Sequence, residues 1–91
     1  MVDEKIWFIT GASRGIGRAI AERALAAGDK VALVARGEDV SALADSLGAH
    51  CMACSADVSD ADAVVAAVAS VVERWGRVDV LVNNAGLHRG G

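Results

Sequence analysis

The sequence predicts an α/β protein with a doubly wound parallel sheet of four strands, which alternate with three helices and lie in the order 3-2-1-4. Short apolar runs alternate with alanine-rich stretches of helical periodicity along the chain. The strand-like runs, such as Val31-Ala32-Leu33-Val34, are apolar on both faces, which is typical of a parallel sheet covered by helices on each side. Right-handed crossovers between such strands lead to this order.

Each predicted element has recognisable ends. The expected strands cover residues 5–10, 30–35, 50–55 and 78–82. The expected helices cover residues 16–27 and 39–47, and a third follows its N-cap Ser59 and ends at Trp75. A glycine comes after each helix, where a left-handed cap is favoured. The helical spacing predicts that the buried stripe of the third helix consists of Val64, Val68, Val71 and Trp75.

Composition limits the class of protein. The chain suits a single domain, residues 1–91, without an internal linker, and its hydrophobic fraction of 54% is largely alanine and valine. The longest mainly apolar stretch, 63–72, is much shorter than the roughly 20 residues of a membrane-spanning helix. The start lacks the features of a signal peptide, so we expect a cytoplasmic protein. A net charge of −3 without a basic stripe argues against nucleic-acid binding.

Three glycines mark a candidate phosphate site. Gly11, Gly15 and Gly17 lie between the first strand and the first helix. A diphosphate needs backbone N–H groups aimed at it and no side chains in the way, and a helix N-terminus adds roughly half a positive charge. The pyrophosphate is therefore expected over Gly15, Ile16 and Gly17. The spacing differs from the common dinucleotide fingerprint, so this loop alone is weak evidence, but the flanking strand and helix supply the required context.

Two further motifs extend this site. Asp57-Val58 follows the third strand, and Asn83-Asn84-Ala85-Gly86 follows the fourth. Together with the run from Thr10 to Gly17, they resemble the short-chain dehydrogenase/reductase family of the classical type, in the same order and at comparable spacing. The resemblance covers the whole chain. It implies a Rossmann-like fold, of which the chain is the N-terminal cofactor-binding portion.

The resemblance also implies roles for single residues. Ser13 and Ile16 would contact the ribose and the pyrophosphate. Asp57 would accept a hydrogen bond from the adenine amino group, and the Val58 N–H would reach a ring nitrogen. The ribose on the nicotinamide side would be lined by Asn83, Ala85 and Gly86.

Independent physical arguments and simpler alternatives apply to the same positions. Asp57 follows a strand at the rim where open parallel sheets bind ligands. Alternatively, Asp57 only caps a turn before Ser59. For Asn83 the alternative is turn chemistry, because asparagine tolerates left-handed geometry and bonds its own backbone.

The end of the second strand indicates which dinucleotide is bound. In NAD binders an acidic residue about 20 positions beyond the glycine loop accepts from the ribose 2′-hydroxyl, whereas an arginine suits a 2′-phosphate. Here the strand ends Val34-Ala35-Arg36, and Arg14 can approach from the other side. NADP(H) is therefore the expected cofactor. NAD(H) is the alternative, because a slight shift would bring Glu38 or Asp39 toward the ribose and leave Arg36 as an ordinary solvated charge.

Several conspicuous residues are expected to be structural. Cys51 and Cys54 have the spacing of a redox or zinc motif. They fall within a predicted strand, where they point to opposite faces with Cα atoms about 10 Å apart, too far for a disulfide. His50 and His88 have no partner spacing that suggests a metal site and are expected to be exposed. Trp7 is expected to belong to the core.

The chain contains no tyrosine. The resemblance implies catalysis by a tyrosine acid/base assisted by a lysine, a serine and an asparagine, all of which lie later in the family's sequence. The only lysines here, Lys5 and Lys30, fall at strand starts. Losing proton delivery costs typically two to four decades in rate. We therefore expect a chain that is truncated after its fourth strand and inactive alone.

The apolar outer edge of the strand at 78–82 is a predicted aggregation site. We expect it to be covered by a neighbouring chain, as in a homo-oligomer, or by the remainder of a longer polypeptide. The leading interpretation is the NADP(H)-binding segment of a short-chain oxidoreductase that acts on carbonyl or alcohol substrates by hydride transfer. The alternatives are a stand-alone, non-catalytic nucleotide-binding or interaction module from a shortened gene, and a non-functional remnant.

Overall fold

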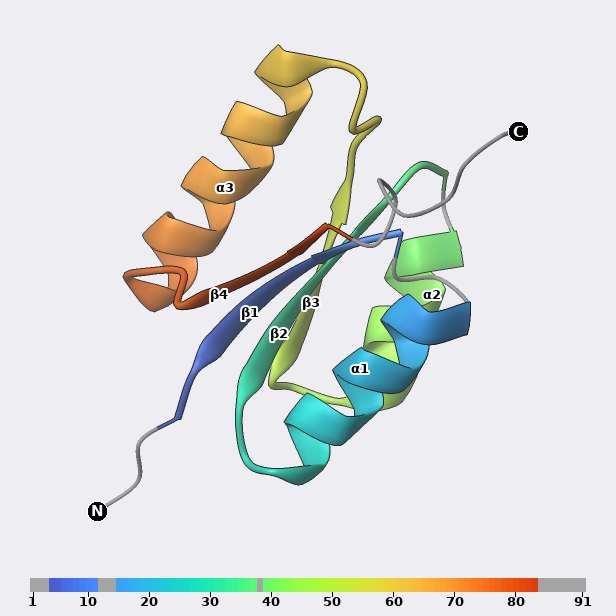
Figure 1. Cartoon of the computed structure of the whole chain (residues 1–91), viewed down its shortest axis with the longest axis vertical. Coiled ribbons are helices and arrows are strands. Elements are labelled where there is room, and N and C mark those ends of the chain that lie inside the picture. Colours follow the sequence, from blue (N-terminus) through green and yellow to red (C-terminus); the bar gives the residue numbers. More distant parts are fainter. Residues whose placement is uncertain (1–3, 12–14, 38, 84–91) are drawn as a thin grey trace.

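Strands and helices alternate throughout the part of the chain that the computed structural model describes, namely residues 4–11, 15–37 and 39–83. The elements are β1 (Ile6–Thr10), α1 (Gly15–Ala26), β2 (Lys30–Ala35), α2 (Asp39–Leu47), β3 (Cys51–Ser55), α3 (Ala61–Trp75) and β4 (Val80–Asn83). All strand pairs are parallel, and the order is β3-β2-β1-β4. The predicted doubly wound α/β fold and its 3-2-1-4 order are therefore confirmed (Figure 1).

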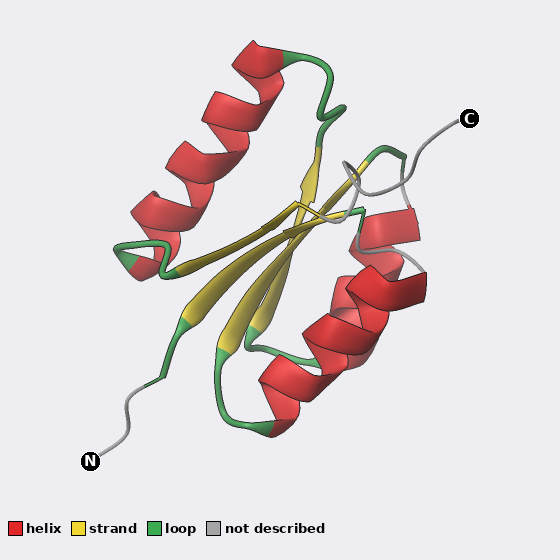
Figure 2. Ribbon diagram, in the orientation of Figure 1, coloured by secondary structure: helices red, strands yellow, loops and turns green. Residues whose placement is uncertain are grey.

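Helices cover both faces of the sheet. Figure 2 shows α1 and α2 together on one side and α3 on the other. The central strand β2 contributes side chains to the hydrophobic clusters on both faces of the sheet, because successive side chains of a strand point to opposite faces. Val31 and Leu33 pack in the cluster with α1 and α2, whereas Ala32 and Val34 pack in the cluster with α3. This two-sided burial explains why the strand is apolar at every position between 31 and 34.

The N-cap of α3 is Asp60, so the prediction of Ser59 was wrong. Asp60 Oδ1 accepts hydrogen bonds from the backbone N–H groups of Asp62 and Ala63, at 3.1 and 3.3 Å. Ser59 is committed elsewhere, because both its N–H and its hydroxyl donate to Asp57 Oδ1, at 2.9 and 2.7 Å. A carboxylate at this position also suits the positive end of the helix.

The fourth strand begins and ends later than predicted. It covers Val80–Asn83 instead of 78–82. Asp79 precedes it, and its side chain replaces a backbone acceptor for the N–H of Ile6. The other strands and helices match their expected bounds to within one residue.

The buried stripe of α3 is partly as predicted. Val71 is fully buried, and Val68 and Trp75 pack against the core. The stripe also includes Ala67, which is buried, whereas Val64 is only half-buried. No helix within the described ranges is both long enough and apolar enough to cross a bilayer.

Cys51 and Cys54 are free, buried and on opposite faces of the sheet. Cys51 packs in the cluster with α1 and α2, and Cys54 packs in the cluster with α3. Burial raises the pKa of Cys51 to about 11 and also raises the pKa of Cys54. Both thiols therefore stay protonated, as expected of structural cysteines. His50 is exposed, and Trp7 is half-buried against the cluster of α1 and α2.

Candidate functional site

The predicted site residues that the structure describes lie at the carboxyl ends of the strands. The strands are parallel, so these ends form one rim of the sheet, and α1 starts at the same rim (Figure 2). The chain leaves β1 for α1 on one face, whereas it reaches β4 from α3 on the other face. Between β1 and β4 the connections thus diverge to opposite sides, and open α/β sheets bind ligands at such a switch point.

Two glycines open the N-terminus of α1 at this rim. Gly11 and Gly15 have φ angles of +63° and +68°, a left-handed conformation that favours glycine. A Cβ added at Gly15 would meet no protein atom within 4 Å, so the space beside this residue is open. Ile16 is 65% exposed, whereas Gly17 is buried in the packing of α1.

This helix end fits an anionic group. The first N–H groups of a helix have no acceptor within the helix, and the aligned peptide dipoles add a partial positive charge there. The N–H of Gly11 has another task, because it donates to the Val34 carbonyl at 2.8 Å. The groups that can meet a phosphate are therefore those of the first turn of α1, beginning at Gly15 and Ile16.

At the switch point, Thr10 and Asn83 lie opposite each other in the register of β1 and β4. The Thr10 hydroxyl lies 3.3 Å from the Val82 carbonyl oxygen and 3.2 Å from Asn83 Oδ1, so it can donate to either. Thr10 was not among the residues predicted for the site. A lone polar residue at the end of an apolar strand was the signal that could have identified it.

Arg36 and Asp57 come together beyond the ends of β2 and β3. Arg36 Nη1 lies 3.6 Å from Asp57 Oδ2, and the two side chains are 77% and 43% exposed. The hydroxyl and N–H of Ser59 donate to Asp57 and lower the pKa of its carboxyl, and Arg36 adds to this effect. The turn-capping role of Asp57 is therefore present. Val58 is 40% exposed at the same corner.

Four of the predicted site residues lie outside the described residues: Ser13, Arg14, Ala85 and Gly86. The same holds for Glu38 and His88. A hollow of about 500 Å³ lies elsewhere, beside α2 and the start of β3. Asp45, Cys51 and Arg74 are among its lining residues, and it includes none of the predicted site residues.

Comparisons with known proteins match this chain to a known family. The family model described as short chain dehydrogenase matches residues 5–91. "Oxidoreductase BOA17" of Botryotinia fuckeliana is 49% identical over 84 residues, which make up 90% of this chain and 31% of that protein. The chain spans about a third of the length of the curated relatives that it matches, from 31% to 35%.

Solved structures agree with the sequence match. A 3-ketoacyl-(acyl-carrier-protein) reductase from Brucella melitensis, complexed with NADH, superposes with a TM-score of 0.81 at 36% identity, over 85% of this chain and 32% of that one. A variant of actinorhodin polyketide ketoreductase with NADPH superposes with a TM-score of 0.83 at 41% identity, over 90% of this chain and 33% of that one. The chain therefore belongs to the short-chain dehydrogenase/reductase family.

Proposed function

We propose that this chain is the NADP(H)-binding segment of a short-chain oxidoreductase that transfers hydride between the cofactor and a carbonyl or alcohol substrate. The observation that carries the proposal is the N-terminus of α1, which begins at a glycine with positive φ and lies beside the switch point between β1 and β4. The names of two structural neighbours add support, since one was solved with NADH and the other with NADPH. A cytoplasmic location is part of the proposal.

In this proposal, different residues of the rim bind different parts of the dinucleotide. The first turn of α1 holds the pyrophosphate, and Asp57 and Val58 bind the adenine. The 2′-phosphate lies between Arg36 and Arg14. The remaining proposed contacts to the cofactor are those of Gly11, Ser13, Gly15, Ile16, Gly17, Asn83, Ala85 and Gly86.

The assignment of NADP(H) rests on Arg36. Its side chain is 77% exposed, and its 3.6 Å separation from Asp57 is longer than a hydrogen bond, so the guanidinium is only loosely held. Asp39, one of the two acids that would favour NAD(H), is the first residue of α2. There it faces the positive end of that helix, which is a favourable place for a carboxylate.

The chemical step is proposed for the whole protein. When bound, the cofactor supplies or accepts the hydride. This chain has no tyrosine to act as the acid/base that the family resemblance implies. We therefore assign cofactor binding and orientation to the chain, and proton transfer to other residues of the complete enzyme.

The outer edge of β4 belongs to the same proposal. Among the described strands, β4 pairs with β1 alone, and Leu81 is 65% exposed. An uncovered apolar strand edge promotes aggregation. We infer that a further part of the polypeptide or a second copy covers it. Size exclusion tests this inference, and a monodisperse 9.3 kDa species at high concentration would contradict it.

Titration of NADPH and NADH against the chain and two variants tests the cofactor assignment. Arg36→Ala should weaken NADPH binding by about 10- to 100-fold, because a charge-assisted hydrogen bond contributes roughly 1.5 to 3 kcal/mol. It should leave NADH binding nearly unchanged. Arg23→Ala is the matched control, since Arg23 is exposed in the last turn of α1, away from the rim. Equal affinity of the unmodified chain for both cofactors would end the NADP(H) assignment.

A further inference from the structure

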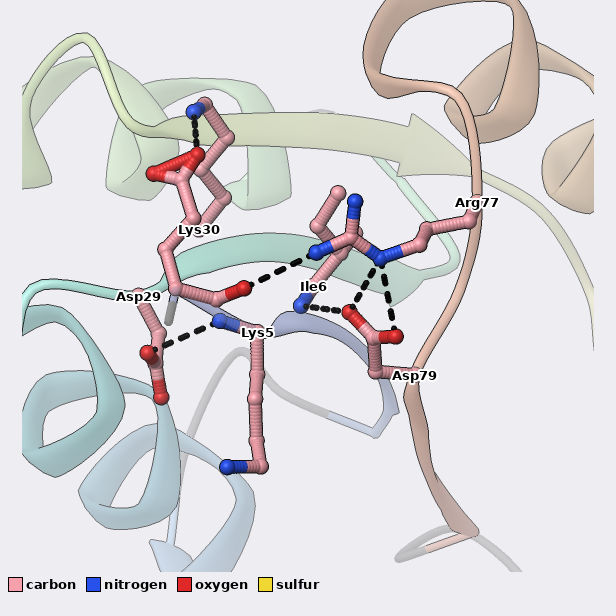
Figure 3. A network of polar contacts seen from close by, with 7 residues as sticks. Lys5, Ile6, Asp29, Lys30, Arg77 and Asp79 are labelled. Atoms are coloured by element: carbon pink, nitrogen blue, oxygen red, sulfur yellow. Dashed lines mark hydrogen bonds and ion pairs between the residues drawn. The ribbon is translucent and has the colours of Figure 1, made fainter. Parts of the chain in front are cut away.

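A group of polar contacts joins β1 to β4 at the amino ends of the strands, opposite the rim (Figure 3). Asp79 Oδ2 accepts a hydrogen bond from the Ile6 N–H at 2.8 Å, and the Asp79 N–H donates to the Ile6 carbonyl at 2.8 Å. Arg77 Nε lies 2.9 and 3.0 Å from the two carboxylate oxygens of Asp79. Arg77 Nη2 also donates to the Glu4 carbonyl at 3.0 Å. We call Arg77, Asp79 and their backbone partners at Glu4 and Ile6 the amino-end clasp.

The clasp distinguishes one β4 register from another, which the backbone hydrogen bonds between β1 and β4 do not. Backbone ladder bonds are chemically alike at every residue, so they do not distinguish one register from another. The apolar pattern of β4 excludes only some registers: Val80 and Val82 are half-buried, whereas Leu81 and Asn83 are exposed. A slip by one residue exchanges these faces and is penalised, but a slip by two residues preserves the alternation.

A two-residue slip would displace the rim of the sheet. Each residue of a parallel strand advances about 3.3 Å, so Asn83 would move about 6.6 Å away from its place opposite Thr10. The hydrogen bond between Asp79 and the Ile6 N–H forms in one register alone, because its acceptor is a particular side chain. The clasp therefore opposes the slip that the backbone and the apolar pattern allow.

We propose that Asp79, held by Arg77, is a positioning residue that sets the register of β4 and so places Asn83 opposite Thr10 at the candidate site. The part of this inference that concerns cofactor affinity rests on the proposed function. The part that concerns register does not.

Asp29 provides a matched control on the other side of β1. Its Oδ1 accepts from the Lys5 N–H at 3.0 Å, and its Oδ2 accepts from Trp7 Nε1 at 2.9 Å. This carboxylate thus also binds the start of β1, but it lies just before β2, and the donors to it are Lys5 and Trp7. Asp29→Ala removes comparable hydrogen bonds without affecting the β4 register.

The experiment compares four variants of the chain by NMR: Asp79→Ala, Asp79→Asn, Arg77→Ala and Asp29→Ala. The readouts are the contact between the Thr10 and Asn83 side chains and the protection of the Ile6 amide from hydrogen exchange. Asp79→Ala should lose the contact and lower the protection about tenfold or more. Asp79→Asn should retain both, because its amide oxygen can still accept from Ile6. Arg77→Ala should lower the protection to an intermediate degree.

Two results would overturn the register proposal. One is an unchanged Thr10–Asn83 contact in Asp79→Ala. The other is an equal loss in Asp29→Ala, which would indicate general loosening of the sheet. Should Asp79→Ala fail to fold, Arg77→Ala decides: reduced protection of Ile6 with a weaker Thr10–Asn83 contact supports the proposal, and no change in either overturns it.

NADPH titration tests separately whether the β4 register affects cofactor affinity. Asp79→Ala should bind about two- to thirtyfold more weakly than the unmodified chain, while Asp79→Asn and Asp29→Ala should bind nearly normally. Normal binding by a folded Asp79→Ala overturns the link to the site. Absence of NADPH binding by the unmodified chain counts against the proposed function alone, because the NMR readouts need no cofactor.

Discussion

The two ends of the sheet are built in different ways. At the amino ends, the carboxylates of Asp29 and Asp79 accept hydrogen bonds from β1 and from neighbouring side chains. At the carboxyl ends, Gly11 and Gly15 adopt left-handed conformations and a helix presents its N-terminus. Arg36 there is more than three-quarters exposed.

Under the proposed function, this difference assigns the alignment of the strands to the amino ends of the sheet and the binding of the cofactor to the carboxyl ends. Bonds from side chains to backbone suit the amino ends, because each one specifies a particular alignment of two strands. Backbone donors without side chains in the way suit the carboxyl ends, because a bound diphosphate can then approach closely. Changes at the amino ends should therefore act first on stability and register, and changes at the carboxyl ends first on affinity.

The largest expected effect separates two glycines that both have a positive φ angle. Gly15 at the rim has φ +68° and Gly48 after α2 has φ +109°, and a Cβ on either would meet no atom within 4 Å beyond its own neighbours along the chain. Alanine at each position should destabilise the fold by about 1–2 kcal/mol through backbone strain. Gly15→Ala alone should weaken NADPH binding, by about tenfold or more, because its Cβ projects beside the helix end. Isothermal titration and urea unfolding measure the two effects.

Equal affinities of the Gly15→Ala and Gly48→Ala variants would contradict this assignment of the rim. A loss of stability in Gly15→Ala without the same loss in Gly48→Ala would contradict the strain argument. The affinity measurement thus tests the binding role of the rim, and the stability measurement tests the strain argument.

The next effect concerns the loss of folding stability at acidic pH. Hydrogen bonds from the Lys5 N–H and Trp7 hold the pKa of Asp29 below its ordinary value of 3.8, and the bond from the Ile6 N–H does the same for Asp79. A carboxyl whose pKa is lower in the folded state stabilises the fold above its unfolded pKa. That stability is lost as the pH falls from about 4 through the lower folded value.

The free energy of unfolding should depend less on pH in the acidic range when these carboxyls are removed. In Asp29→Asn and Asp79→Asn, the free energy of unfolding should change less between pH 5 and pH 2 than in the unmodified chain, because one linked proton is lost in each. Urea midpoints across this range measure the slope. Slopes that match that of the unmodified chain would show that these carboxyls do not carry acid stability.

The smallest expected effect concerns the two buried thiols of β3. Cys51 and Cys54 should react with a disulfide reagent at pH 8 much more slowly than an exposed cysteine, because both are buried and the pKa of each is raised. Their labelling should speed up in urea as the sheet opens. Rapid labelling of either thiol under native conditions would contradict its burial between helix and sheet.

Much of the candidate site could be predicted from the sequence. Gly15 and Asp57 are placed by local context, since one follows a strand and opens a helix and the other follows a strand directly. Thr10 and Asp79 were not predicted. A lone acid in an apolar run was the available signal for Asp79, but nothing local shows that its carboxylate reaches the N–H of a residue 73 positions away.

The sequence by itself determined the type and order of the elements and hence the parallel sheet. Hydrophobic periodicity and glycine placement are local properties, and crossover handedness limits how such elements can be joined. Only the tertiary structure decided that Arg36 lies beside Asp57 and that Asp79 binds the start of β1. These choices depend on which polar partners meet when separate segments pack, and a hydrogen bond has no fixed spacing along the chain.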